Sequence, residues 1–225
     1  KYWYWGDALK PDFVVLDPVL SVGLPAPLTA ATGVDALVHA MEAATNRGSN
    51  PGNDLYAFAA IRLAVGYLQK AVSDPGDLDA RTRMLLCASA AGVAIDNAGT
   101  ALAHNVGHAL GSLMPIHHGR AVAIGMAATL PWVIEGNRDA FGRVAEAFGL
   151  GTVEALPGRF RALLDELGVD LSLPRAVDSA TLANHMGAPE NAAMLSATVR
   201  DATPADLEIL AEAVLAITIR PSEAA

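Results

Sequence analysis

Two pairs of polar residues, each spaced four positions apart inside runs of Ala, Val, Leu and Met, constrain the fold more than any other feature of this chain. The first pair is Asp35 and His39, and the second is His104 and His108. On an α-helix, residues four apart share one face, with Cβ atoms roughly 5–6 Å apart. Each pair therefore predicts a helix that presents two polar groups in one direction from an otherwise apolar surface.

The composition also favours helices. The chain has 225 residues, of which 52% are hydrophobic and 17% charged, so it can bury a substantial core in one domain or two small ones. Ala and Leu are abundant, aromatic residues make up only 5%, and few stretches show the β-branched alternation of strands. We therefore expect a mainly α protein built as a multi-helix bundle.

Turn-forming residues divide the chain into expected elements. A short β-rich run from Pro11 to Pro18 predicts one strand that enters the domain and has no evident partner. Helices are expected over about 30–45, 54–72, 78–95, 100–110, 120–134, 139–148, 159–167, 179–186 and 204–216. The predicted organisation is a strand and linker over residues 1–22, followed by a helical domain over residues 23–225.

The two ends of the chain carry separate expectations. The aromatic stretch 1–5 is either a terminal tail or a surface that packs on a preceding segment, and we favour the second interpretation. The last residues, 221–225, are expected to fray.

Charge and motif content exclude several classes of partner. The net charge is −9 and Lys and Arg do not cluster, which argues against nucleic acid or an anionic membrane as a partner. The single cysteine, Cys87, and the lack of a signal peptide or a long apolar run predict a reducing, cytoplasmic setting with Cys87 as a packed thiol. Glycine-rich phosphate loops and the serine nucleophile elbow are missing from the sequence. We therefore expect a small-molecule ligand.

The polar pairs suggest a metal site. A carboxylate on an apolar face costs several kcal/mol unless it is paired, hydrogen-bonded or metal-bound, so Asp35 needs compensation. One aspartate with three histidines makes a plausible four-ligand site for iron or zinc. The plainer alternative is that Asp35 caps a helix or pairs with an arginine, while each histidine is hydrogen-bonded in the core.

Two stretches resemble the motifs of a known family. Residues 27–42, with sequence PLTAATGVDALVHAME, and residues 102–111, with sequence LAHNVGHALG and a His-Gly pair at 118–119, resemble the iron-containing (group III) alcohol dehydrogenases. The similarity runs from about residue 10 to 137. It implies a helical carboxy-terminal domain of the dehydroquinate synthase-like kind, preceded in the family by a nucleotide-binding domain that this chain does not show.

The resemblance also assigns roles to residues. The implied metal ligands are Asp35, His39, His104 and His118. His108 is implied to be a catalytic proton-relay or positioning group beside the substrate. The chain departs from the family at His117, where proline is common, and this second imidazole either perturbs the site or is a plain surface residue. Glu42 and Asn97 match family positions and are expected to make hydrogen bonds on helix faces, while His185 is expected to be a surface or packing residue.

The implied function is NAD(P)-dependent oxidation of a small alcohol, or reduction of an aldehyde. Fe²⁺ or Zn²⁺ is expected to polarise the substrate oxygen. We also expect a homodimer, the commonest oligomeric state. Two alternatives stay open. One is a metal-dependent lyase or hydrolase of related fold, in which the same ion would activate water. The other is a non-catalytic fragment that lacks the nucleotide domain.

Overall fold

Helices account for all of the regular structure in the described residues, 6–218, of this computed structural model. The α-helices are α1 (Ala26–Thr45), α2 (Pro51–Ser73), α3 (Leu78–Ala98), α4 (Leu102–Leu113), α5 (His118–Ile134), α6 (Arg138–Ala147), α7 (Ala155–Glu166), α8 (Ser179–Met186), α9 (Ala192–Ala197) and α10 (Pro204–Thr218). Short 3-10 helices are η1 (Asp7–Leu9), η2 (Pro18–Ser21) and η3 (Pro189–Asn191). The mainly α prediction is confirmed, whereas the expectations for residues 1–5 and 221–225 lie outside the described residues.

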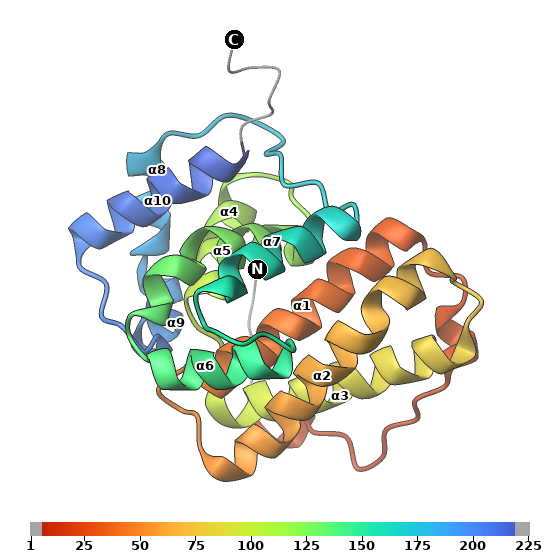
Figure 1. The fold of residues 1–225 in the computed structure, drawn as a ribbon. Coiled ribbons are helices and arrows are strands. Elements are labelled where there is room, and N and C mark those ends of the chain that lie inside the picture. The colour runs from red at the N-terminus through yellow and green to blue at the C-terminus, as the bar shows by residue number, and fades with distance from the viewer. Residues whose placement is uncertain (1–5, 219–225) are drawn as a thin grey trace.

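Helix α1 lies between two groups of helices (Figure 1). It packs on α2 and α3 along one side and on α5 along the other. Helices α4 and α5 pack against each other, and α8 and α10 cover this pair on the side away from α2 and α3. This arrangement puts the part of α1 around Asp35 next to α4 and α5, which carry the other predicted ligands.

The strand predicted over Pro11–Pro18 does not form. Residues 11–17 are mostly exposed and have no strand assignment, and Pro18 begins η2. An extended segment becomes a strand only when its backbone N–H and C=O groups pair with a second strand, and the described residues offer none. The prediction was wrong because strand-like composition does not supply a partner.

Glycines set how closely the site helices approach one another. A Cβ added at Gly119 would lie 2.7 Å from the carbonyl carbon of Ala31, so the first turn of α5 touches the backbone of α1. A Cβ at Gly125 would lie 3.1 Å from the carbonyl carbon of Ala103 on α4. Only glycine permits these distances, and Gly119 directly follows one predicted ligand, His118.

The turn between α3 and α4 sets the direction of the second ligand helix. Gly99 has φ 77°, a left-handed conformation that favours glycine, and α3 and α4 are bent by 98° at this break. The side-chain amide of Asn46 donates hydrogen bonds to the carbonyls of Ala98 (3.0 Å) and Gly99 (2.9 Å), which holds the turn against the end of α1.

Within the described chain no single helix is long and apolar enough to cross a membrane. Only the bent pair of α3 and α4, taken together, meets that length and hydropathy requirement.

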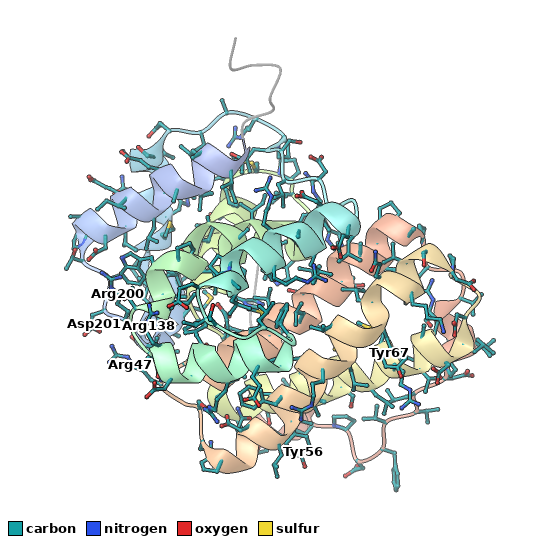
Figure 2. The ribbon with its side chains drawn as sticks, viewed as in Figure 1. Arg47, Tyr56, Tyr67, Arg138, Arg200 and Asp201 are labelled. Atoms are coloured by element: carbon teal, nitrogen blue, oxygen red, sulfur yellow. The ribbon has the colours of Figure 1, made fainter. Side chains whose placement is uncertain are left out.

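The C-terminal helices are fastened to the end of α1 by Arg47. Its Nε donates to the carbonyl of Thr198 at 2.7 Å, and its guanidinium pairs with the exposed carboxylate of Asp201 at 2.6 Å (Figure 2). Nearby, the guanidinium of Arg200 lies 4.1 Å from the ring centroid of Trp132 and donates to its carbonyl. These contacts fix the segment between α9 and α10 against α1 and α5.

The buried thiol of Cys87 belongs to the core. It lies at the contact of α3 with α2, where its Sγ donates to the carbonyl of Ala60 at 3.3 Å. Burial raises the pKa of the Cys87 thiol to about 12, which keeps it protonated and unreactive near neutral pH. The interpretation of Cys87 as a packed residue is confirmed.

Candidate metal centre

Helix α1 supplies a carboxylate and an imidazole from adjacent turns. Asp35 and His39 are both partly buried, and the Asp35 side chain is 20% exposed. The surrounding positions of α1, including Leu37 and Val38, are fully buried, so the helix presents this polar pair from an apolar element. The i, i+4 spacing read from the sequence produces the shared direction that it predicts.

Helix α4 brings a second imidazole to this pair. The Nε2 of His104 lies 3.5 Å from Oδ1 of Asp35, and its ring stacks on that of His39 with centroids 4.3 Å apart. One ligand atom from each of these three side chains lies within 4.8 Å of the other two. Such a nitrogen and oxygen set suits a first-row divalent cation.

The predicted fourth ligand comes from the start of α5. The Nε2 of His118 lies 3.7 Å from Oδ1 of Asp35, and its ring centroid is 5.6 Å from that of His104. The structure thus places the three predicted histidines around Asp35, with His39 and His104 in the compact group and His118 at its edge. His117 is the residue before α5 and is exposed, which agrees with the surface interpretation of that position.

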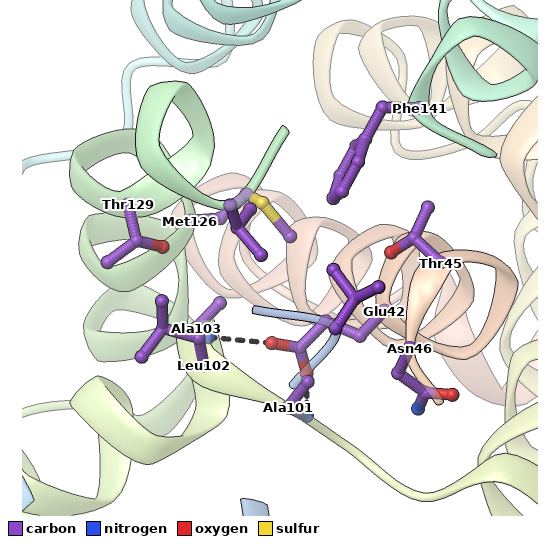
Figure 3. A pocket seen from close by; sticks show the side chains of 11 residues that line it. Glu42, Thr45, Asn46, Ala101, Leu102, Ala103, Met126, Thr129 and Phe141 are labelled. Carbon is purple, nitrogen blue, oxygen red and sulfur yellow. Dashed lines mark hydrogen bonds between the residues drawn. The ribbon is translucent and has the colours of Figure 1, made fainter. Parts of the chain in front are cut away.

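Glu42 is the important side chain to which sequence reasoning gave only a generic role. Its Oε2 lies 2.6 Å from Nδ1 of His104, and its carboxylate accepts hydrogen bonds from the backbone N–H groups of Ala101 (2.7 Å) and Ala103 (2.6 Å). Glu42 therefore caps α4, which has no side-chain cap of its own, and points into the helix N-terminus (Figure 3). The sequence indicated only the direction of Glu42, because positions 35, 39 and 42 share one helix face, and not its partner His104.

The contact with Glu42 determines which nitrogen of His104 faces Asp35. A hydrogen bond from Nδ1 to the carboxylate leaves Nε2 as the coordinating atom, an arrangement often found for histidine ligands. Within the described residues, Nε2 of His104 and Oδ1 of Asp35 are both buried and have no hydrogen-bond partner. Buried polar atoms without partners are costly, and a cation between them would satisfy both. The donor set and these two atoms fit a divalent metal.

The charges at the centre favour a positive species between the two carboxylates. Burial opposes ionisation of Asp35, but the imidazoles of His104 and His39 outweigh it and lower the pKa of Asp35 to about 2. Burial lowers the pKa of His39 to about 4, so its imidazole is neutral at pH 7. Burial also opposes the charged form of His104, but Glu42 and Asp35 raise its pKa to about 9. A metal cation at Nε2 would take the place of that imidazolium proton.

The remaining predicted residue, His108, borders the cavity next to the centre. It is half-buried one turn after His104, and its ring meets that of His118 edge-on with centroids 5.5 Å apart. His108 and His118 both line a cavity of about 400 Å³, with Gly107, Gly111, Ser112, Ile116, Glu190 and Asn191 completing the lining. His185 lies outside the ligand cluster and makes a 2.9 Å contact from Nδ1 to the hydroxyl of Ser112.

The fold and site define a helical metal-binding domain, and comparison with known proteins gives its family. A model of the Fe-containing alcohol dehydrogenase family, C-terminal, matches residues 29–213. The 1,3-propanediol dehydrogenase of Citrobacter freundii is 36% identical over 170 residues, which are 73% of this chain and 44% of the relative. Long-chain-alcohol dehydrogenase 1 of Geobacillus thermodenitrificans is 33% identical over 203 residues, 87% of this chain and 49% of the relative.

Solved structures agree with the sequence comparison. A 1,3-propanediol oxidoreductase superposes with a TM-score of 0.81 at 30% identity, covering 88% of this chain and 54% of that one. The iron-containing alcohol dehydrogenase of Thermococcus thioreducens superposes with a TM-score of 0.82 at 25% identity, covering 93% of this chain and 56% of that one. The chain belongs to the iron-containing alcohol dehydrogenase family. It spans about half the length of the relatives that it matches.

Proposed function

We propose that this chain is the metal-binding part of an NAD(P)-linked alcohol dehydrogenase that also reduces aldehydes. The observation that carries the proposal is the cluster of Asp35, His39 and His104, in which two buried atoms lack hydrogen-bond partners among the described residues. Relatives are named as dehydrogenases of 1,3-propanediol and, with NAD, of methanol. The substrate class that fits these names is a small primary alcohol or its aldehyde.

In this proposal the four predicted ligands, Asp35, His39, His104 and His118, hold one divalent ion. When bound, the ion supplies Lewis acidity at the alcohol oxygen, and NAD or NADP supplies the hydride acceptor. Asp35 provides the negative charge that balances the cation, and Glu42 orients His104 so that Nε2 faces the ion. The family favours iron, although zinc binds such nitrogen and oxygen sites more tightly in the general affinity order.

In this proposal His108 accepts the proton that the alcohol releases. Oxidation of an alcohol releases the hydroxyl proton, and an imidazole is the side chain best suited to move a proton near neutral pH. His108 and His118 line the same cavity, so His108 borders the space that a molecule bound beside the centre would occupy. His108 is one turn from His104 and is not needed as a ligand in this assignment. A homodimer in the cytoplasm completes the proposal.

Metal analysis tests the ligand assignment without any need for turnover. We expect about one Fe²⁺ or Zn²⁺ per chain in the purified protein and in His108→Ala, and loss of the metal in Asp35→Ala and His104→Ala, because removal of a ligand leaves the remaining groups too few donors. Mass spectrometry of the intact metal-loaded protein measures the stoichiometry. Stoichiometric metal in both ligand variants would refute the assignment.

A matched pair of adjacent histidines sharpens the test. His118→Ala should weaken metal binding, whereas His117→Ala should retain it, because only His118 lies beside Asp35. Circular dichroism of each variant checks that the helices remain folded. In the full-length protein, a change in nicotinamide absorbance with simple alcohols would then separate a dehydrogenase from a metal-dependent lyase or hydrolase.

A further inference from the structure

One acidic side chain borders two cavities, one of which lies next to the metal centre. Glu190, in η3, lines the cavity of about 400 Å³ that also contains His108 and His118. It also lines a second cavity of about 500 Å³, together with Ala98, Gly99, Thr100, Ala193, Met194 and Ala197. Among the residues that line either cavity, Glu190 is the only one with a carboxylate. A molecule that extends from the centre through the first cavity would therefore meet a single negative charge.

The Glu190 carboxylate is available to such a molecule. Its residue is exposed, and within the described part of the chain it forms no hydrogen bond or ion pair. The first cavity is in the size range of small-molecule sites and is much larger than a two- or three-carbon alcohol. It has room for a substrate that carries a second functional group several bonds from the reacting hydroxyl.

The wall that carries Glu190 is fixed to the same helix as the metal ligand His104. The buried amide of Asn105 on α4 donates to the carbonyls of Met186 (2.8 Å) and Asn191 (3.5 Å). The amide of Asn191 donates to the carbonyl of His185 at 2.8 Å, and the His185 ring meets the hydroxyl of Ser112, also on α4, at 2.9 Å. These hydrogen bonds hold the segment from α8 to η3 against α4. The backbone position of Glu190 relative to the centre is therefore set by the fold.

We propose that Glu190 is a specificity-determining residue that favours alcohols carrying a positive charge, such as protonated amino alcohols, over neutral or anionic alcohols. The inference rests on the proposed dehydrogenase function and names the substrate class for that site. An ammonium group near a carboxylate is favoured and a carboxylate is repelled, and solvent reduces both effects at an exposed position. The expected preference is therefore modest, about five- to tenfold in kcat/KM.

The test uses the full-length, metal-loaded enzyme and two substrates of equal size. 3-Aminopropan-1-ol is protonated near neutral pH, and butan-1-ol has a methyl group in place of the ammonium. In Glu190→Gln, the ratio of kcat/KM for the amino alcohol to that for butan-1-ol should fall about five- to tenfold, with butan-1-ol itself little changed. The kcat/KM for 3-hydroxypropanoate should rise. High salt should shrink each difference, because the carboxylate is exposed.

Control variants and outcomes distinguish failure of the Glu190 role from failure of the proposed dehydrogenase function. Glu208→Gln removes an exposed carboxylate on α10 that lines neither cavity, and it should leave the ratio unchanged. An unchanged ratio in Glu190→Gln, or an equal fall for both alcohols, would overturn the specificity role while leaving the dehydrogenase proposal intact. If the metal-loaded enzyme oxidised neither alcohol, the proposed function would fail and this inference would fall with it.

Discussion

The residues around the centre and the segment before α1 differ in how far other parts of the chain bury them. At the centre, Asp35 and Glu42 lie within contact distance of side chains from α4 and α5, and the flanking α1 residues are fully buried. In the segment over residues 11–20, apolar side chains are open to solvent, with Phe13 91% exposed and Val15 87% exposed. Both regions have apolar sequence, but only the first has helices arranged around it.

This difference shows where the stability of the domain comes from. The free energy of burial is proportional to the apolar surface removed from water, so exposed side chains such as Phe13 contribute little to folding. The centre has the opposite character, since buried charges there are tolerated only because each one has a compensating neighbour. Substitutions at the centre should therefore be costly, and those in the segment should be nearly silent.

Among substitutions at the centre, Glu42→Ala should produce the largest change in stability. It leaves Nδ1 of His104 and the N–H groups of Ala101 and Ala103 buried without an acceptor, and breaking a buried ion pair of this kind costs about 3–5 kcal/mol. Urea unfolding of the metal-free protein measures the change. Glu208→Ala on the exposed face of α10 is the matched control and should change the free energy of unfolding by less than about 0.5 kcal/mol.

The pH dependence of that difference gives an independent check. Burial opposes ionisation of Glu42, but His104 and two backbone N–H groups outweigh it and lower the pKa of Glu42 in the folded protein below its ordinary 4.5. A lowered pKa stabilises the fold above the unfolded value and loses that contribution as pH falls through the folded value. The gap between wild type and Glu42→Ala should therefore be widest between pH 4.5 and 6.5, the ordinary pKa values of Glu42 and His104, and should narrow below pH 4.5. It should also narrow as pH rises toward about 9, where His104 loses the proton that pairs with Glu42. If the difference in unfolding free energy did not change with pH, the charge of the Glu42 carboxylate would not be the source of the stabilisation.

Local sequence signals predicted the helices well. Caps at Asn50, Asp77 and Asp178 accept the backbone N–H three residues on, as such residues do at helix starts, and α8 has the predicted bounds. Helix α1 begins at Ala26, four residues before the expected position, with Thr29 inside it. Helix α9 was missed because its six residues carry too little periodicity. The strand prediction failed because strand formation is a non-local property: it depends on pairing with a second segment.

For the site, the sequence could predict which residues share a helix face but not which helices meet. The i, i+4 spacing predicted that Asp35 and His39 point together, while the close contact of α5 with α1 and with α4 depends on glycines at their crossing points. The resemblance to a known family supplied that long-range information for His118. The contact between Glu42 and His104 joins residues 62 positions apart, so spacing alone could not reveal it.

Gly119→Ala should have an intermediate effect that is concentrated at the centre. The added Cβ would lie 2.7 Å from the carbonyl carbon of Ala31, so the start of α5 must move away from α1. Overpacking of this kind costs about 1–3 kcal/mol, and the shift should also draw His118 away from Asp35 and weaken metal binding at least about tenfold. Calorimetric titration with Zn²⁺ measures the affinity. Gly142→Ala on α6, where an added Cβ has no neighbour within 4 Å, should leave metal affinity unchanged.

Phe13→Ala should have the smallest effect, and Phe141→Ala makes the same chemical change in the core. Phe141 on α6 is 2% exposed, so its truncation should cost about 3–5 kcal/mol of unfolding free energy, whereas truncation of Phe13, at 91% exposure, should cost less than about 0.5 kcal/mol. Denaturant unfolding of this chain by itself measures both. A loss above about 1 kcal/mol in Phe13→Ala would mean that the segment before α1 packs on the helical domain. The contrast between a centre that other helices bury and a segment whose apolar side chains are exposed would then no longer hold.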